Sequence, residues 1–131
     1  MTLVLSIVTA LWFVFMTWLS HQDGEHTRET SEKLAENLSF FNPDKDVLHH
    51  YLRRVAHVIV FLVLVILLEL TLLTAGKNPY CGVFPCLVWA LIDEVTKLLI
   101  KDRHFSWSDV GLNLLGVGIG CVGVASAIWI L

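Results

Sequence analysis

Two adjacent carboxylates, Asp93 and Glu94, lie within an apolar stretch of the sequence, and Lys97 follows one helical turn later. A charged side chain at the centre of a membrane helix costs about 2.5–3.5 kcal/mol, so such residues are kept where they pair or serve a function. Asp93 and Lys97, at i and i+4, can form a structural ion pair. Adjacent helical residues point about 100° apart, so we expect the second carboxylate to need a partner on another helix. The candidate partners are Arg53, Arg54, His57 and Arg103.

A group of basic residues opens the preceding apolar block. In the segment HHYLRRVAH, residues 49–57, His49, Arg53 and His57 share one helix face, and Arg54 lies on the adjacent one. An arginine pair beside a histidine suits phosphate recognition, because guanidinium groups bind phosphate oxygens in a fork and imidazole can move a proton. The alternative is that the arginines only extend toward lipid headgroups.

A stripe of polar and then small residues begins the last apolar block. Asp109, Asn113, Gly116 and Gly120 are spaced i, i+4, i+7 and i+11, so they lie on one helix face. The two glycines form a GxxxG motif, which permits close contact between helices. The stripe therefore predicts either a tight seam with another helix or a slot for a lipid chain.

The sequence indicates no resident metal or cofactor. The segment HQDGEH, residues 21–26, holds two His and two carboxylates, but its spacing fits no helical zinc motif. A divalent ion that bridges Asp93, Glu94 and a bound phosphate is an open alternative, because hard cations prefer oxygen ligands. No glycine-rich phosphate loop or nucleic-acid-binding signature is present, so we expect no cofactor and no nucleic-acid partner.

Four apolar blocks must position these residues in a chain of 131 residues, of which 56% are hydrophobic. With a mean hydropathy of +0.70, too little polar sequence remains to surround a soluble core. A membrane helix needs about 20 apolar residues. The pattern predicts an all-α, polytopic membrane protein, a single domain over residues 1–131 with four transmembrane helices in a bundle. The predicted spans are residues 3–19, 55–75, 81–100 and 110–131.

Two local sequence patterns add a predicted interfacial helix and a predicted helix cap to this bundle. In the long segment 20–54, Leu34, Leu38 and Phe41 recur at helical spacing opposite a charged face. This pattern predicts a short amphipathic helix at the membrane interface, with a segment packed over the bundle as the alternative. Either Ser106 or Ser108 is expected to cap the last helix.

Charged residues gather at one side of the predicted bundle, which we call side A and which includes the segments 20–54 and 101–109. All six His and eight of the nine Lys and Arg are expected there, and Lys77 alone lies on the opposite side B. The basic residues of side A are Arg28, Lys33, Lys45, Arg53, Arg54, Lys97, Lys101 and Arg103. The positive-inside rule puts side A in the cytoplasm. The count of basic residues does not indicate the orientation if the arginines are there to bind an anionic ligand.

Several of these motifs follow one another in a recognisable order. They are Ser20-His21-Gln22, LRRVAH (52–57), ALIDEVTK (90–97), Arg103, and Asp109-x3-Asn113-x2-Gly116-x3-Gly120. The series resembles the VanZ-like family of small bacterial membrane proteins over about residues 20–120. Lys97 stands where that family usually has Gln, and Lys101-Asp102 replaces its usual Pro-Gly turn.

The resemblance implies a multi-pass protein of the bacterial plasma membrane that acts in the cell envelope. The family takes its name from a member linked to resistance to the glycopeptide teicoplanin. The resemblance also suggests that side A faces outward, against the count of basic residues.

We therefore expect one shared polar site at the side A mouth of the bundle. Its ligand-binding members are Arg53, Arg54, Asp93, Arg103, Asp109 and Asn113, with His57 and Glu94 as candidate catalytic acid or base. The expected partner is a membrane lipid, either anionic or an isoprenoid phosphate, and a homo-oligomer is a possible assembly. Two alternatives stay open: a structural or regulatory membrane subunit whose buried charges are interhelical ion pairs, and an enzyme that modifies such a lipid. A proton-coupled transporter is less favoured, since Glu69 is the only other deep acid.

Overall fold

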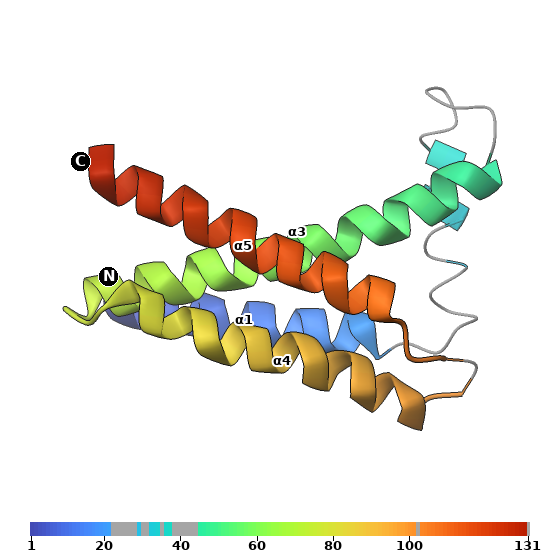
Figure 1. Ribbon diagram of the computed structural model, residues 1–131, viewed down its shortest axis with the longest axis horizontal. Helices are drawn as coiled ribbons and strands as arrows, with labels where there is room; N and C mark the ends of the chain where they lie inside the picture. Colours follow the sequence, from blue (N-terminus) through green and yellow to red (C-terminus); the bar gives the residue numbers. More distant parts are fainter. Residues whose placement is uncertain (22–28, 30–31, 35, 38–44, 102, 131) are drawn as a thin grey trace.

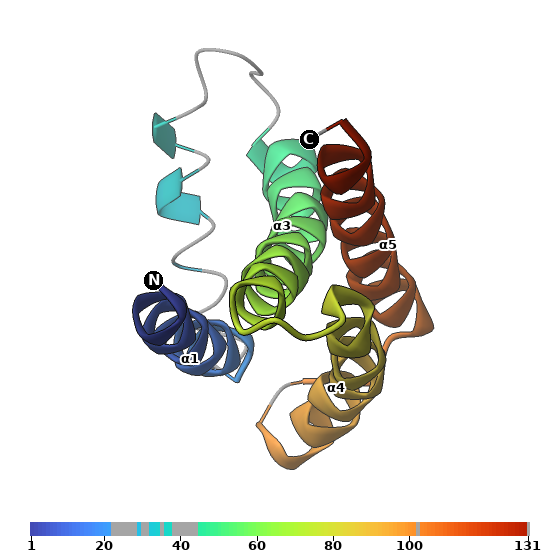
Figure 2. The ribbon, with the colours of Figure 1, turned by 90° about the vertical axis from the view of Figure 1, so that its left-hand side faces the viewer.

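The computed structural model is all-α throughout the part of the chain that it describes, which confirms the all-α part of the predicted fold class. It describes residues 1–21, 29, 32–34, 36–37, 45–101 and 103–130. The helices are α1 (Thr2–Ser20), α3 (Lys45–Thr74), α4 (Val83–Thr96) and α5 (Trp107–Ile130), with the short 3₁₀ turns η1 (Pro79–Gly82) and η2 (Lys97–Leu99). Figures 1 and 2 show α3 between α1 and α5, with α5 crossing α3 obliquely and α4 packed beside α5.

Within the described residues, three helical stretches are long and apolar enough to cross a membrane: α1, residues Tyr51–Thr74 of α3, and α5. The predicted fourth span, residues 81–100, is not confirmed. Its central helix α4 has 14 residues, which is shorter than the roughly 20 needed to cross the bilayer core. The 3₁₀ turns η1 and η2 flank it, and Pro79 begins η1, where the missing amide of proline is tolerated.

Helix α3 begins at Lys45, well before the predicted start at residue 55. Hydropathy identifies only the part of a helix that matches the hydrocarbon core, whereas the backbone hydrogen bonds of the helix continue through polar residues. The basic segment 49–57 is therefore the first part of α3 rather than a loop that leads to it.

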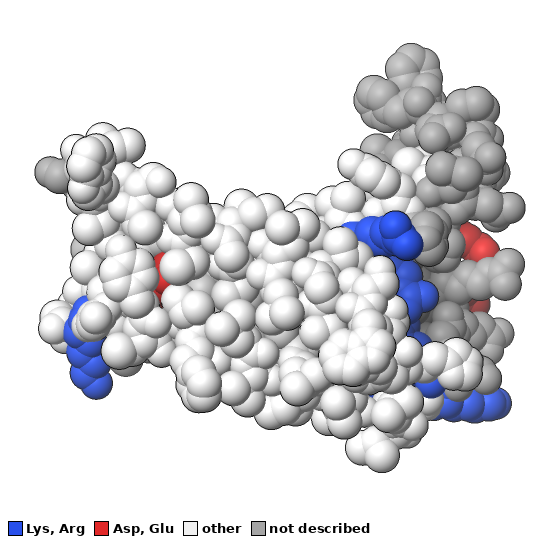
Figure 3. Space-filling model, in the orientation of Figure 1, with Lys and Arg blue, Asp and Glu red and all other residues white. Residues whose placement is uncertain are grey.

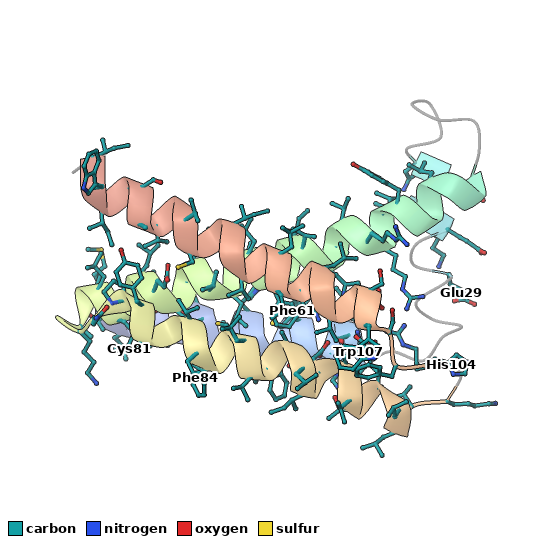
Figure 4. The ribbon with its side chains drawn as sticks, viewed as in Figure 1. Glu29, Phe61, Cys81, Phe84, His104 and Trp107 are labelled. Carbon is teal, nitrogen blue, oxygen red and sulfur yellow. The ribbon has the colours of Figure 1, made fainter. Side chains whose placement is uncertain are left out.

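The apolar core lies where α1, α3, α4 and α5 meet. Its buried members are Met16, Phe61, Leu64, Val65, Cys86, Ala90 and Val117, and Figure 4 shows Phe61 at the middle of the bundle. Helix α1 is also tied to α3 by a hydrogen bond from the indole Nε1 of Trp12 to the carbonyl oxygen of Val60, at 3.0 Å.

The seam between α3 and α5 depends on glycine. A Cβ at Gly116 would overlap the carbonyl oxygen of Val58, and a Cβ at Gly120 would overlap the side chain of Val65. The backbone of α3 therefore occupies the space beside this GxxxG motif, so the seam holds two helices together and leaves no room there for a lipid chain.

The interfacial helix predicted within residues 20–54 falls mostly outside the described residues. Residues 29, 32–34 and 36–37 are helical, and Leu34 is exposed. Leu38 and Phe41, on which the amphipathic pattern depends, are not described, so this helix stays a prediction.

Candidate functional site

Side A of the bundle carries a cluster of buried charges at the end of α4. The Nζ atom of Lys97 lies 2.7 Å from Oε2 of Glu94 and 3.4 Å from Oδ2 of Asp93. All three side chains are at most 1% exposed. We call these three residues the α4 ion triad.

The expectation that Lys97 faces only one of the two carboxylates is wrong. On a helix the position of Lys97 is bracketed by its i−3 and i−4 neighbours, Glu94 and Asp93, which lie on either side of it. One flexible ammonium group with three donors therefore reaches both carboxylates.

Other segments supply the remaining hydrogen bonds of the carboxylates. The hydroxyl of Ser20 donates to Oδ2 of Asp93 at 2.7 Å. The backbone amide of Ser106 donates to Oε1 of Glu94 at 3.1 Å. The α4 ion triad thus joins the end of α1 and the start of α5 to α4.

Ser106 caps α5, which settles the choice between the two predicted serines. Its hydroxyl accepts a hydrogen bond from the amide of Asp109 at 3.3 Å. In a capping box the acidic residue at this position would bond back to the amide of the capping residue. Here Glu94 takes that amide, so the carboxylate of Asp109 is left to face α3.

Replacing Ser106 by alanine should destabilise the protein by about 1 kcal/mol, because an N-cap hydroxyl contributes about that much to a helix. The midpoint of thermal unfolding in detergent should fall accordingly. Ser108→Ala is the matched control, since the Ser108 side chain is exposed and does not cap the helix. An equal effect of the two substitutions would contradict this assignment.

The polar end of the α5 stripe meets the basic face of α3 and forms a second group, which we call the α3–α5 cluster. The Nδ1 atom of His57 lies 2.9 Å from Oδ1 of Asn113, and its Nε2 lies 3.4 Å from Oδ2 of Asp109. The Nη2 atom of Arg53 lies 3.6 Å from the same oxygen of Asp109. The side chain of Arg53 is 42% exposed, so this cluster opens toward the surface.

Arg103 lies between the α4 ion triad and the α3–α5 cluster. It is buried and donates to the backbone oxygen of Ser20 at 3.2 Å. Burial lowers the pKa of the Arg103 guanidinium, and the charge of Arg53 lowers it further. Three carboxylates oppose this by raising that pKa: Glu94, Asp109 and Asp93. Because arginine keeps its charge in proteins, two guanidinium groups are held near each other at side A.

Figures 3 and 4 show this concentration of charge at the end of the bundle where His104 and Trp107 are labelled. Seven of the eight predicted site residues belong to the two groups or to Arg103: Arg53, His57, Asp93, Glu94, Arg103, Asp109 and Asn113. Arg54 is exposed, and no ion pair links it to another residue in the part of the chain that is described.

Sequence reasoning missed the contributions of Ser20, His21, Thr96 and the Ser106 amide. His21 places Nε2 at 2.6 Å from the hydroxyl of Thr96 and Nδ1 at 3.9 Å from Oδ1 of Asp93. The only available signal was the Ser20-His21-Gln22 motif directly after the first span. A backbone amide such as that of Ser106 leaves no signature in residue types.

The arrangement is better suited to holding charge than to moving protons. Both ring nitrogens of His57 face protein oxygens. Both carboxylate oxygens of Glu94 accept from protein donors, and its side chain is fully buried. A substrate would have to displace these partners before either residue acted as an acid or base. Among the described residues, no group of His, Cys, Asp and Glu could hold a metal ion.

Comparison with known families agrees with the order of the motifs. Residues 5–129 match the family described as VanZ/LLP1. No curated protein and no solved structure matches this chain significantly.

Proposed function

The chain belongs to the VanZ/LLP1 family, and we propose that it binds the anionic headgroup of a membrane lipid, or of a lipid-linked intermediate of the cell envelope, at side A. The apolar helices make it a membrane protein that crosses the bilayer more than once. Residence in the bacterial plasma membrane and a part in glycopeptide resistance belong to the same proposal, and the family match supports them.

The approach of two guanidinium groups carries this proposal. Arg53 and Arg103 are near enough for the charge of one to lower the pKa of the other, so an anion placed beside both would be attracted to both. A phosphate would accept charge-assisted hydrogen bonds from both. Arg53 is the exposed member of the pair and Arg103 the buried one, so a headgroup would reach them from the membrane surface.

The amide of Asn113 adds a further donor. Asn113 is fully buried, and its Nδ2 atom has no hydrogen-bond partner in the part of the chain that is described. An orphaned buried donor costs about 1–3 kcal/mol. A ligand oxygen that accepts from this atom would remove that cost.

Replacing Arg53 by alanine should weaken binding of an anionic lipid by roughly tenfold or more, because a hydrogen bond to a charged group contributes about 1.5–3 kcal/mol. Native mass spectrometry of the purified protein, titrated with phosphatidylglycerol, measures this directly. Phosphatidylcholine should bind weakly to both proteins, since its headgroup has no net charge.

Arg54→Ala is the matched control, because Arg54 is the adjacent arginine and is exposed. It should leave the affinity nearly unchanged. Equal losses in the two variants would mean that the arginines act only as general surface charge. A folded protein that binds neither lipid would exclude a headgroup site.

The second candidate is a structural or regulatory membrane subunit, and the α4 ion triad favours it. Lys97 lies against both carboxylates, and Arg103 is near enough to interact with both, so these charges need no ligand. If the protein is such a subunit, Arg53→Ala would leave lipid binding unchanged and would lower only the stability of the protein. The third hypothesis, a lipid-modifying enzyme, is disfavoured because the hydrogen-bonding atoms of His57 and Glu94 already have partners.

A further inference from the structure

Glu69 is a buried acid far from side A. It lies in the second half of α3, its side chain is 0% exposed, and neither carboxylate oxygen has a hydrogen-bond partner in the part of the chain that is described. It stands within the stretch Tyr51–Thr74, which is apolar enough to cross a membrane. An unpaired carboxylate in such surroundings would cost several kcal/mol, so the group is expected to carry a proton instead.

Two thiols from the neighbouring helices lie within electrostatic range of Glu69. Cys121 of α5 is near it without meeting hydrogen-bond geometry. Cys86 of α4 lies within range of its charge. Hard cations require several oxygen ligands, which these thiols do not provide, and no metal-binding group is found among the described residues. The carboxyl group of Glu69 and the two thiols are therefore better suited to binding a proton than to binding a metal ion.

A groove of about 390 Å³ lies beside Cys86, and Glu69 itself is not among its lining residues. It lies between α1, α3 and α4, and the thiol of Cys86 forms part of its wall. Three hydroxyl groups line it, those of Ser6, Thr9 and Thr71. Ser6 and Thr9 lie in the first half of α1, and Thr71 lies near the end of α3. These parts of the two helices are at the end of the bundle that contains the N-terminus and Cys81 (Figures 1 and 4).

We propose that Glu69 is a proton-binding site in the membrane interior, reached through the groove between α1, α3 and α4 from side B. Protonated Glu69 fits the closed packing of α3 against α4 and α5, because it carries no charge. Release of the proton would leave a charge that only water admitted through the groove could solvate. Proton exchange at Glu69 is thereby linked to opening of the bundle beside Cys86.

Reaction with a hydrophobic carbodiimide tests this site. The acid adds to dicyclohexylcarbodiimide: the carboxyl oxygen bonds to the central carbon, and the proton passes to a nitrogen. The product then rearranges to a stable N-acylurea. Intact-mass and peptide-mass analysis of the full chain in liposomes should find one adduct, located on the peptide with Glu69. Glu94, which is paired with Lys97, should stay unmodified.

Glu69→Gln should abolish the adduct, whereas Glu94→Gln should leave it unchanged. If Glu69→Gln does not fold, the peptide map of the wild-type protein locates the adduct by itself. An adduct on Asp93 or Glu94 instead of Glu69, or no adduct at all, would overturn the proposal.

The route is tested by a matched pair of substitutions on α1. Ser6 lines the groove, and Ile7, its exposed neighbour, does not. Ser6→Trp should slow labelling of Glu69 by filling the groove, and Ile7→Trp should not. Equal rates in both variants would overturn access through the groove.

Discussion

Replacing Lys97 by methionine is expected to destabilise the protein by about 3–5 kcal/mol, the range observed when one partner of a buried ion pair is removed. Lys97 is fully buried and is the ammonium partner of both Glu94 and Asp93, at 2.7 and 3.4 Å. Without it, two carboxylates would be left one residue apart inside the bundle. We expect the thermal unfolding midpoint in detergent to fall sharply, or the variant not to accumulate as a folded protein.

Two further variants make this result specific. Lys101→Met removes an exposed lysine one turn further along the chain and should change stability by less than about 0.5 kcal/mol. Adding Asp93→Asn and Glu94→Gln to Lys97→Met removes the uncompensated charges and should restore much of the lost stability. Unchanged unfolding of Lys97→Met alone would show that other groups neutralise the carboxylates.

Replacing Gly116 by alanine should destabilise the seam between α3 and α5. The added methyl group would overlap the carbonyl oxygen of Val58 and lie 3.1 Å from the amide nitrogen of Leu62. Backbone atoms cannot rotate away as side chains do, so the helices must separate. Overpacking of this kind costs about 1–3 kcal/mol, and occasionally more. Thermal unfolding or titration with a denaturing detergent would measure the loss.

Gly118→Ala provides the control on the same helix. A Cβ at Gly118 meets no atom within 4 Å, and alanine is favoured over glycine in a helix by up to about 1 kcal/mol. This substitution should therefore be neutral or stabilising. If Gly116→Ala were equally well tolerated, the close approach of α3 and α5 would be wrong.

Helical periodicity was enough to group many of the candidate residues. Asp109, Asn113, Gly116 and Gly120 recur on one helix face, and the structure turns that face toward α3. The arginines and His57 likewise follow from i, i+4 spacing. Such grouping works because the helix has a constant rotation per residue.

Contacts that depend on two or more segments were not predictable in the same way. The hydrogen bonds of Asp93 and Glu94 to Ser20 and to the amide of Ser106 join residues far apart in the sequence. The sharing of Lys97 between both carboxylates was local, and was missed because only the i+4 neighbour was considered. The prediction of one continuous span over residues 81–100 also did not distinguish α4 from the 3₁₀ turns on either side of it, since hydropathy does not report backbone geometry.

The sequence alone was sufficient to predict an all-α membrane protein, the helix faces that carry charge, and the family. The reason is that hydrocarbon requires every spanning backbone to satisfy its own hydrogen bonds within a helix, so apolar length and helical period are informative. The tertiary structure was needed to show which helix each face meets. It placed Arg103 within range of two charged groups, and among the described residues it left Glu69 without a hydrogen-bond partner near Cys86 and Cys121. Those outcomes depend on how whole helices cross and pack, and residue spacing within one helix carries no information about that.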